Sequence, residues 1–292
     1  MTEMMAEYLF CHSDYLNRVA TMQHKVISAD LFSTQLSIID IYSSHVKWSI
    51  VDNRHNACGD NIESLFNAGN ECLGTFYNDR RQQSMGIYRA EKEEWEHVTD
   101  IPSRDKLCLY GITADRDHVY IVGGMDDHRV VQETILVYDI NTGMECDRKK
   151  MSSKRRVCSC TVIDKMLYVG GGSDGVKLLN SIECISLNDH TSQHSVTATP
   201  TYYCSLTSLC DRLVMLGGRV DGTFDSPVSN KVSVLIPSLN SWLPLPAMTE
   251  ERFLHGACTV DDDTLVVMGG LTYVSSRDTF DSVSICELLR FE

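Results

Sequence analysis

A short apolar strand followed by two glycines recurs four times along this chain of 292 residues. The copies read VYIVGG, LYVGGG, LVMLGG and LVVMGG, and their glycines are Gly123 and Gly124, Gly171 and Gly172, Gly217 and Gly218, and Gly269 and Gly270. The second glycines of successive copies are 48, 46 and 52 residues apart. Because a fixed period near 50 residues marks a repeat architecture, this spacing predicts the blades of a β-propeller.

A second marker, an aromatic residue in a fixed place within each copy, runs in phase with the glycines. Tryptophan ends three strand-and-turn segments, at Trp48, Trp95 and Trp242, and the steps between them are 47 and 147 residues, the second being three repeats of 49. Tyr88 and Tyr138 occupy equivalent positions in the strands. We expect these rings to fill the gaps between blades, and the glycines to lie where no side chain fits.

Dividing the chain by this period gives six copies, which predicts an all-β fold: a six-bladed β-propeller with four-stranded antiparallel blades. One propeller domain then fills residues 1–292, with approximate blades at 24–57, 58–105, 106–156, 157–202, 203–254 and 255–292. The first two copies are degenerate, with Ser28 and Ala29, then Gly74 and Thr75, at the Gly-Gly positions. One alternative stays open, in which residues 1–60 form a separate helical cap.

The last copy, which ends in VSICELLRFE, has sequence for three strands of a blade. A blade without its outer strand would leave an open sheet edge, which invites aggregation. We therefore expect residues 1–23 to supply a closing strand, at residues 6–10 (AEYLF), and the first inner strand of the first blade.

The repeats resemble kelch motifs over residues 24–292. Beyond the glycines, the kelch pattern of Met, a short gap, Arg and a small residue opening the next blade is matched by MSSKRRVCS from Met151 and MTEERFLHG from Met248. The pattern is weaker in IPSRDKLCL from Ile101 and absent from TPTYYCSL, where Tyr202 and Tyr203 replace the Arg.

This resemblance implies a role in protein recognition. Six-bladed kelch propellers of this kind are similar to the substrate-recognition part of BTB-kelch adaptors, which bring a short degron to a cullin-based ubiquitin ligase. Residues 1–40 are too few for a BTB or BACK domain, so a cullin contact would depend on a BTB domain outside this chain. The chain is then a fragment or isoform of a longer protein, or a kelch protein that binds the same targets without delivering them to the ligase. An actin-associated structural kelch protein and a propeller enzyme remain as alternatives.

The sequence contains little that indicates catalysis. There is no GxxxxGK phosphate loop, no GxSxG nucleophile elbow and no GxGxxG motif that opens a helix, and the twelve cysteines are scattered without the paired spacing of metal ligands. Cys158 and Cys160, separated by one residue, suit neither a redox motif nor a zinc site. We therefore expect a non-enzymatic protein that needs neither a metal nor a cofactor.

Composition also narrows the compartment and the partners. We expect the cysteines to be reduced and packed in the crowded strands, because small apolar thiols pack well there. Reduced thiols indicate a reducing compartment, so we expect a cytoplasmic protein that is also compatible with the nucleus. The N-terminal sequence MTEMMAEYLF lacks the pattern of a signal peptide, and no apolar segment approaches the length of a membrane span. A net charge of −14 argues against nucleic acid and anionic membranes as partners. A protein or peptide ligand is the expected partner.

In a propeller, the loops that leave the inner strands lie on one face, where binding residues concentrate. Arginine and aromatic residues dominate interaction hot spots. The candidates for partner binding, taken from the loops after Gly-Gly and from the segments leading into each blade, are Arg129, Arg155, Arg156, Tyr202, Tyr203, Arg219, Arg252, Phe253, Tyr273 and Arg277.

One local run of charge is basic: Lys149, Lys150, Lys154, Arg155 and Arg156. Two interpretations stay open for this run. It is either a solvated loop or a patch for an acidic peptide, because the planar guanidinium of Arg binds carboxylates and phosphates in a bidentate manner.

Overall fold

The computed structural model of the chain describes residues 17–22, 25–30, 35–40, 49–52, 61–68, 71–77, 83–89, 92, 94–102, 107–189, 191–196, 201–220, 226–261, 263–274, 279–283 and 287–291. These residues form antiparallel sheets whose strands follow one another in chain order. Within the described ranges there is no α-helix, and helical turns are represented by the short 3-10 helix η2 (Pro237–Leu239). The prediction of an all-β fold is therefore confirmed.

Five sheets have four strands each. The first two contain β1 (Asn17–Met22), β2 (Lys25–Asp30), β3 (Gln35–Asp40) and β4 (Ser49–Asp52), then β5 (Asn61–Ala68), β6 (Glu71–Tyr77), β7 (Gln83–Arg89) and β8 (Glu94–Ile101). The third contains β9 (Gly111–Ala114), β10 (His118–Val122), β11 (Thr134–Asp139) and β12 (Glu145–Lys150). The fourth and fifth contain β13 (Ser159–Ile163), β14 (Met166–Gly170), β15 (Ser181–Ser186) and β16 (Ser192–Val196), then β17 (Ser205–Leu209), β18 (Arg212–Leu216), β19 (Val232–Ile236) and β20 (Ser241–Leu245).

The last sheet differs from the expected blade. It has three described strands, β21 (Gly256–Asp261), β22 (Thr264–Met268) and β25 (Glu287–Arg290), and the chain between β22 and β25 forms a separate hairpin of β23 (Leu271–Val274) and β24 (Thr279–Ser282). The predicted closing strand at residues 6–10 lies outside the described residues. The alternative of a helical cap over residues 1–60 is wrong for the part described, because β1 to β4 form a sheet there.

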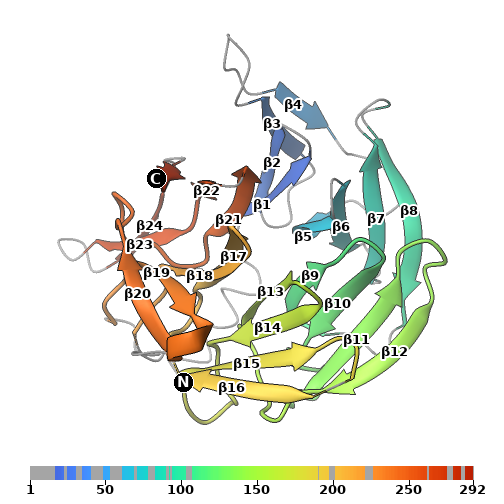
Figure 1. The fold of residues 1–292 in the computed structure, drawn as a ribbon. Helices are drawn as coiled ribbons and strands as arrows, with labels where there is room; N and C mark the ends of the chain where they lie inside the picture. Colours follow the sequence, from blue (N-terminus) through green and yellow to red (C-terminus); the bar gives the residue numbers. More distant parts are fainter. Residues whose placement is uncertain are drawn as a thin grey trace.

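Figure 1 shows these sheets arranged around a common centre, as in a β-propeller. The innermost strands contact one another in chain order, from β1 through β5, β9, β13 and β17 to β21, and β21 contacts β1. The innermost strands of the sheets therefore lie next to one another near the common centre.

Aromatic residues pack between neighbouring sheets. Trp95 lies edge-on to Phe76 with ring centroids 4.7 Å apart, in a cluster that also contains Ile27 of the first sheet. Tyr138 of the third sheet packs in a cluster with residues of the second, and Trp242 of the fifth packs against Ile163 of the fourth. Tyr88 is buried beside Trp95 at 5.4 Å, whereas Trp48 lies outside the described residues.

The paired glycines adopt a backbone conformation that other residues rarely take. All eight have φ between 57° and 94°. A Cβ atom at Gly123 would clash with the carbonyl oxygen of Arg155, which belongs to the segment leading into the next sheet. The first three pairs therefore combine a left-handed turn with close contact to the neighbouring blade, and both requirements select glycine.

Replacing Gly123 with Ala is expected to destabilise the protein by at least ~2 kcal/mol, because a left-handed φ alone costs an L-residue about 1–2 kcal/mol and the Arg155 carbonyl must also move. Gly175→Ala is the matched control, since its φ is 96° but the nearest atom to the new Cβ is a methyl carbon of Val131 at 3.0 Å. Chemical denaturation measures both losses. Equal losses in the two variants would contradict the role given to backbone contact between blades.

Candidate partner-binding face

The loops after Gly-Gly form the same small bridge in four successive sheets. In each, one loop residue pairs in antiparallel fashion with the segment leading into that sheet: Met125 with Cys108, Ser173 with Arg156, Arg219 with Tyr202, and Leu271 with Phe253. The next residue of each leading segment has a positive φ, at Leu109, Val157, Tyr203 and Leu254. We call the surface formed by the described residues of 125–131, 173–178, 219–228 and 271–282 the loop face.

Two of the candidate arginines are wholly buried below this face. Arg155 donates from Nη1 to the carbonyls of Gly171 and Ser181, both at 3.0 Å, and from Nη2 to Ser181 Oγ at 2.8 Å. Arg252 donates from Nη1 to the carbonyl of Gly269 at 3.1 Å and forms an ion pair with the Glu287 carboxylate. Each guanidinium thus ties the first glycine of a pair to the third strand of its sheet.

This burial corrects the expectation that both arginines stand on an exposed rim. The sequence pattern of Met, gap and Arg marks a scaffold position, because the side chain turns inward at each occurrence. Burial lowers the pKa of Arg155, and the surrounding oxygen atoms compensate the guanidinium through hydrogen bonds. The adjacent Arg156 is half-buried, and its Nη1 lies 3.7 Å from Met125 Sδ.

The basic run between the third and fourth sheets does not form a continuous patch. Lys149 is buried, with Nζ 3.2 Å from a carboxylate oxygen of Asp147. Lys150 Nζ lies 2.8 Å from Glu133 Oε1. Together with the burial of Arg155, these pairs leave little of the run's positive charge for an acidic peptide. The run is not a solvated loop either, because Lys149 and Lys150 belong to strand β12.

An aromatic cluster lies beneath the loop face of the last two sheets, and the burial of Tyr202, Tyr203 and Phe253 in it corrects the expectation that they are exposed partner contacts. Ring centroids are 4.2 Å apart for Tyr202 and Tyr203, 5.9 Å for Tyr203 and Phe253, 5.3 Å for Phe253 and Phe280, and 5.6 Å for Tyr273 and Phe280. The cluster brings together four of the candidates that were named from the sequence. Phe280 was missed, although it alternates with polar neighbours in TFDS.

Arg219 joins this cluster from the loop of the preceding sheet. Its Cζ atom lies 5.0 Å from the ring centroid of Phe253 and 5.2 Å from that of Phe280. A guanidinium stacked on two rings gains cation–π energy of roughly 0.5–2 kcal/mol per contact. Arg219 is buried and therefore holds the β23–β24 hairpin against the fifth sheet. Of the other two candidates, Arg129 is exposed on the loop face and Arg277 lies outside the described residues.

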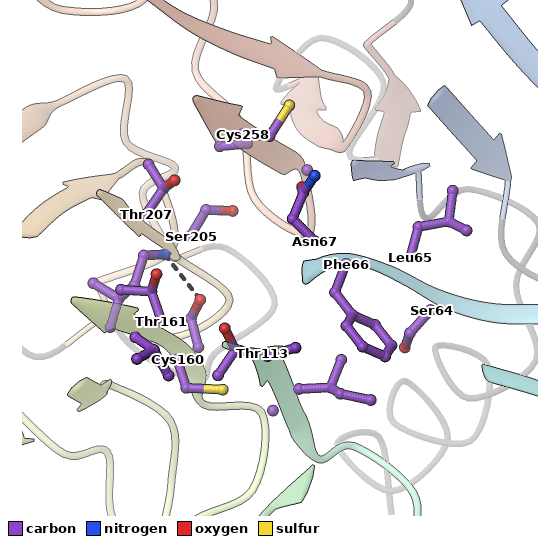
Figure 2. Close-up of a pocket in the computed structure, with 18 of the residues that line it drawn as sticks. Ser64, Leu65, Phe66, Asn67, Thr113, Cys160, Thr161, Ser205, Thr207 and Cys258 are labelled. Carbon is purple, nitrogen blue, oxygen red and sulfur yellow. Dashed lines mark hydrogen bonds between the residues drawn. The ribbon is translucent and has the colours of Figure 1, made fainter. Parts of the chain in front are cut away.

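A cavity of about 350 Å³ lies where the innermost strands converge. Figure 2 shows hydroxyl, amide and thiol groups around it, including Asn67 of β5, Thr113 of β9, Cys160 of β13, Thr207 of β17 and Cys258 of β21. Ser159 Oγ, which also lines the cavity, accepts a hydrogen bond from the backbone N–H of Leu206 at 2.8 Å. Among the described lining residues there is no Asp, Glu, Lys or Arg, so this wall of the cavity is uncharged.

His255 is the one described histidine that lines the cavity, and it is buried. Neither of its ring nitrogens has a hydrogen-bond partner among the described residues. Burial, reinforced by the nearby charge of Arg252, lowers the pKa of His255 to about 3. The imidazole is therefore neutral at physiological pH.

The thiols near the cavity are poor nucleophiles. Burial raises the pKa of Cys160 well above its usual value and that of Cys204 to about 12, so both carry their proton at neutral pH. All nine described cysteines are free. Searching the described residues for three or more His, Cys, Asp or Glu side chains that converge as metal ligands yields no such group. In the same part of the chain, no helix has the length and apolarity needed to cross a membrane.

Comparison with known proteins agrees with the repeat pattern. No family model matches the chain. The chain is 22% identical over 258 residues to the kelch repeat and BTB domain-containing protein 2 of cowpox virus (strain GRI-90 / Grishak), an alignment that covers 78% of this chain and 42% of that protein. The chain thus spans less than half the length of this curated relative. The propeller architecture and this similarity together support the resemblance of the chain to kelch-repeat β-propellers.

Replacing Arg252 with Ala is expected to destabilise the protein by about 3–5 kcal/mol, because Glu287 then keeps a buried carboxylate without its cation. Arg129→Ala is the control, since an exposed arginine usually changes stability by roughly 0.5 kcal/mol or less. Denaturant unfolding compares the two. If Arg252→Ala unfolds like Arg129→Ala, Arg252 has no scaffold role.

His255 makes the stability of the protein depend on pH. Because its folded pKa of about 3 lies below the unfolded value of 6.5, the unfolded state binds more protons between these values, and stability falls as pH falls from 6.5 toward 3. This group contributes a slope of about 1.4 kcal/mol per pH unit. In His255→Leu we expect that slope to vanish, with stability at pH 7 equal or higher, because no ring nitrogen is left unsatisfied.

Urea unfolding at several pH values measures the difference between wild type and His255→Leu. The exposed His128 serves as control, and His128→Leu should retain the wild-type slope. A His255→Leu variant with unchanged pH dependence would show that folding does not lower the pKa of His255.

Proposed function

We propose that this protein is a non-catalytic interaction module that binds a partner protein or a short peptide on its loop face. The observation that carries the proposal is the repeated bridge that anchors the loops of four sheets at equivalent places. Loops held on a rigid scaffold are preorganised, which lowers the entropy that binding must overcome. The similarity to a viral protein described as having kelch repeats and a BTB domain supports the same class of function.

The proposal includes a ring of six blades, with the sheet of β21, β22 and β25 as the sixth. The contact of β21 with β1 supports this arrangement. A fourth strand from residues 6–10 would complete the last sheet and remove its open edge. The division into blades at 24–57, 58–105, 106–156, 157–202, 203–254 and 255–292 belongs to the same proposal.

We further propose that the module is a substrate receptor in ubiquitin-ligase-type recognition in the cytoplasm. The cowpox virus relative is a protein named for its kelch repeats and a BTB domain, and this chain aligns with 42% of that protein. In this proposal, the propeller binds the substrate, while a BTB domain contributed by the wider assembly contacts a cullin. Reduced thiols throughout the described strands support a reducing compartment.

Native affinity purification tests the proposed function. Charge reversal on the loop face, in Arg129→Glu with Lys177→Glu, should abolish capture of the specific partner and leave the melting temperature unchanged, because both side chains are exposed. The control variant reverses two exposed charges on outer strands and turns, in Lys92→Glu with Arg290→Glu, and should capture the partner normally.

Mass spectrometry of the captured proteins separates the possible functions. A partner that disappears only in the loop-face variant supports binding at this face, and a cullin or BTB protein recovered with it supports the adaptor role. Actin captured equally by all variants would instead support the structural alternative. Equal capture of every partner by both variants would place binding elsewhere on the molecule.

A further inference from the structure

Three exposed valines stand on three successive loops of the loop face. Val130, Val176 and Val220 have relative exposures of 46%, 95% and 39%. Seven large hydrophobic residues in the described part of the chain are exposed to this degree. The other four do not recur at equivalent positions on consecutive blades. The loop face thus displays apolar side chains at its tips.

The turns that carry two of these valines are held by aspartate side chains. Asp126 Oδ1 accepts hydrogen bonds from the backbone N–H groups of His128 and Val130, both at 2.9 Å. Asp174 Oδ1 accepts from Val176 and Lys177, both at 2.8 Å, and these bonds lower the pKa of Asp174. The carboxylates therefore point into their own turns and fix each valine at a rigid tip.

Most of the positive charge near this face is engaged within the protein. Arg155 and Arg252 are buried, Arg219 is covered by two aromatic rings, and Arg156 lies against Met125 Sδ. The described wall of the neighbouring cavity is uncharged. Arg129 and Lys177 remain exposed on the loop face. The whole chain nevertheless has a net charge of −14, so an acidic ligand meets long-range repulsion that these two cations offset only in part.

We propose that the loop face binds a peptide segment that is anchored by apolar side chains and carries no net negative charge. This inference rests on the proposed function and specifies the chemistry of its partner. Val130, Val176 and Val220 supply the contact surface, and their preorganised turns keep the entropic cost of binding low. The negative charge of the chain favours approach by neutral or basic segments.

Selection from a random peptide display library on the purified full chain tests this inference. We expect the recovered peptides to be enriched in Leu, Ile, Met and Phe and to have a neutral or positive net charge. Isothermal titration of these peptides should give a dissociation constant at least tenfold weaker for Val130→Ser with Val176→Ser than for wild type. Leu239→Ser with Leu243→Ser, which removes exposed apolar surface outside the loop face, should bind as wild type does.

Enrichment of acidic peptides would overturn the inference and leave binding at the loop face intact. Apolar peptides that bind the double valine variant as tightly as wild type would also overturn it, because the contact surface would then lie elsewhere. Recovery of no peptide would overturn it too, whereas the affinity purification with the charge-reversal variants decides the proposed function independently.

Discussion

The structure depends on a hydrogen bond between each of the first three glycine pairs and the neighbouring blade. The N–H of the second glycine donates to a carbonyl of the segment leading into the next sheet: Gly124 to Arg155 at 2.8 Å, Gly172 to Thr201 at 3.1 Å and Gly218 to Arg252 at 2.9 Å. These bonds need two adjacent left-handed residues without side chains. Because each bond couples one sheet to the next, the repeat in the sequence becomes a succession of sheets packed side by side.

The same constraint separates scaffold from surface. The glycines hold the segment that leads into the next sheet in a fixed position. The arginine in that segment is then buried, as Arg155 and Arg252 are. Its guanidinium then donates a hydrogen bond to the carbonyl of the first glycine of the following pair, Gly171 for Arg155 and Gly269 for Arg252. The residues at the tips of the loops remain exposed. The sequences of these tips differ between blades, whereas the bridges that anchor the loops repeat.

Sequence reasoning located the loop face through the positions of the glycines, but it did not separate supporting from exposed residues on that face. Arg, Tyr and Phe at blade openings were chosen as contacts because such residues are common in interaction hot spots. Most of them are buried, and the exposed valines between them were overlooked. Arg, Tyr and Phe are common at interaction hot spots because a binding partner buries them there. The same residue types are buried between neighbouring blades in this protein, so composition alone does not separate the two cases.

The sequence by itself determined the propeller class, the strand order within each repeat and the places of the loops, because glycine pairs and aromatic residues mark these features locally and periodically. Only the tertiary structure decided which side chains reach the surface. Arg155 and Arg156 are neighbours in sequence, yet the first meets Gly171 and Ser181 inside a sheet and the second lies near Met125 on the loop face. Burial is set by partners that are distant in the chain, and a local pattern does not identify them.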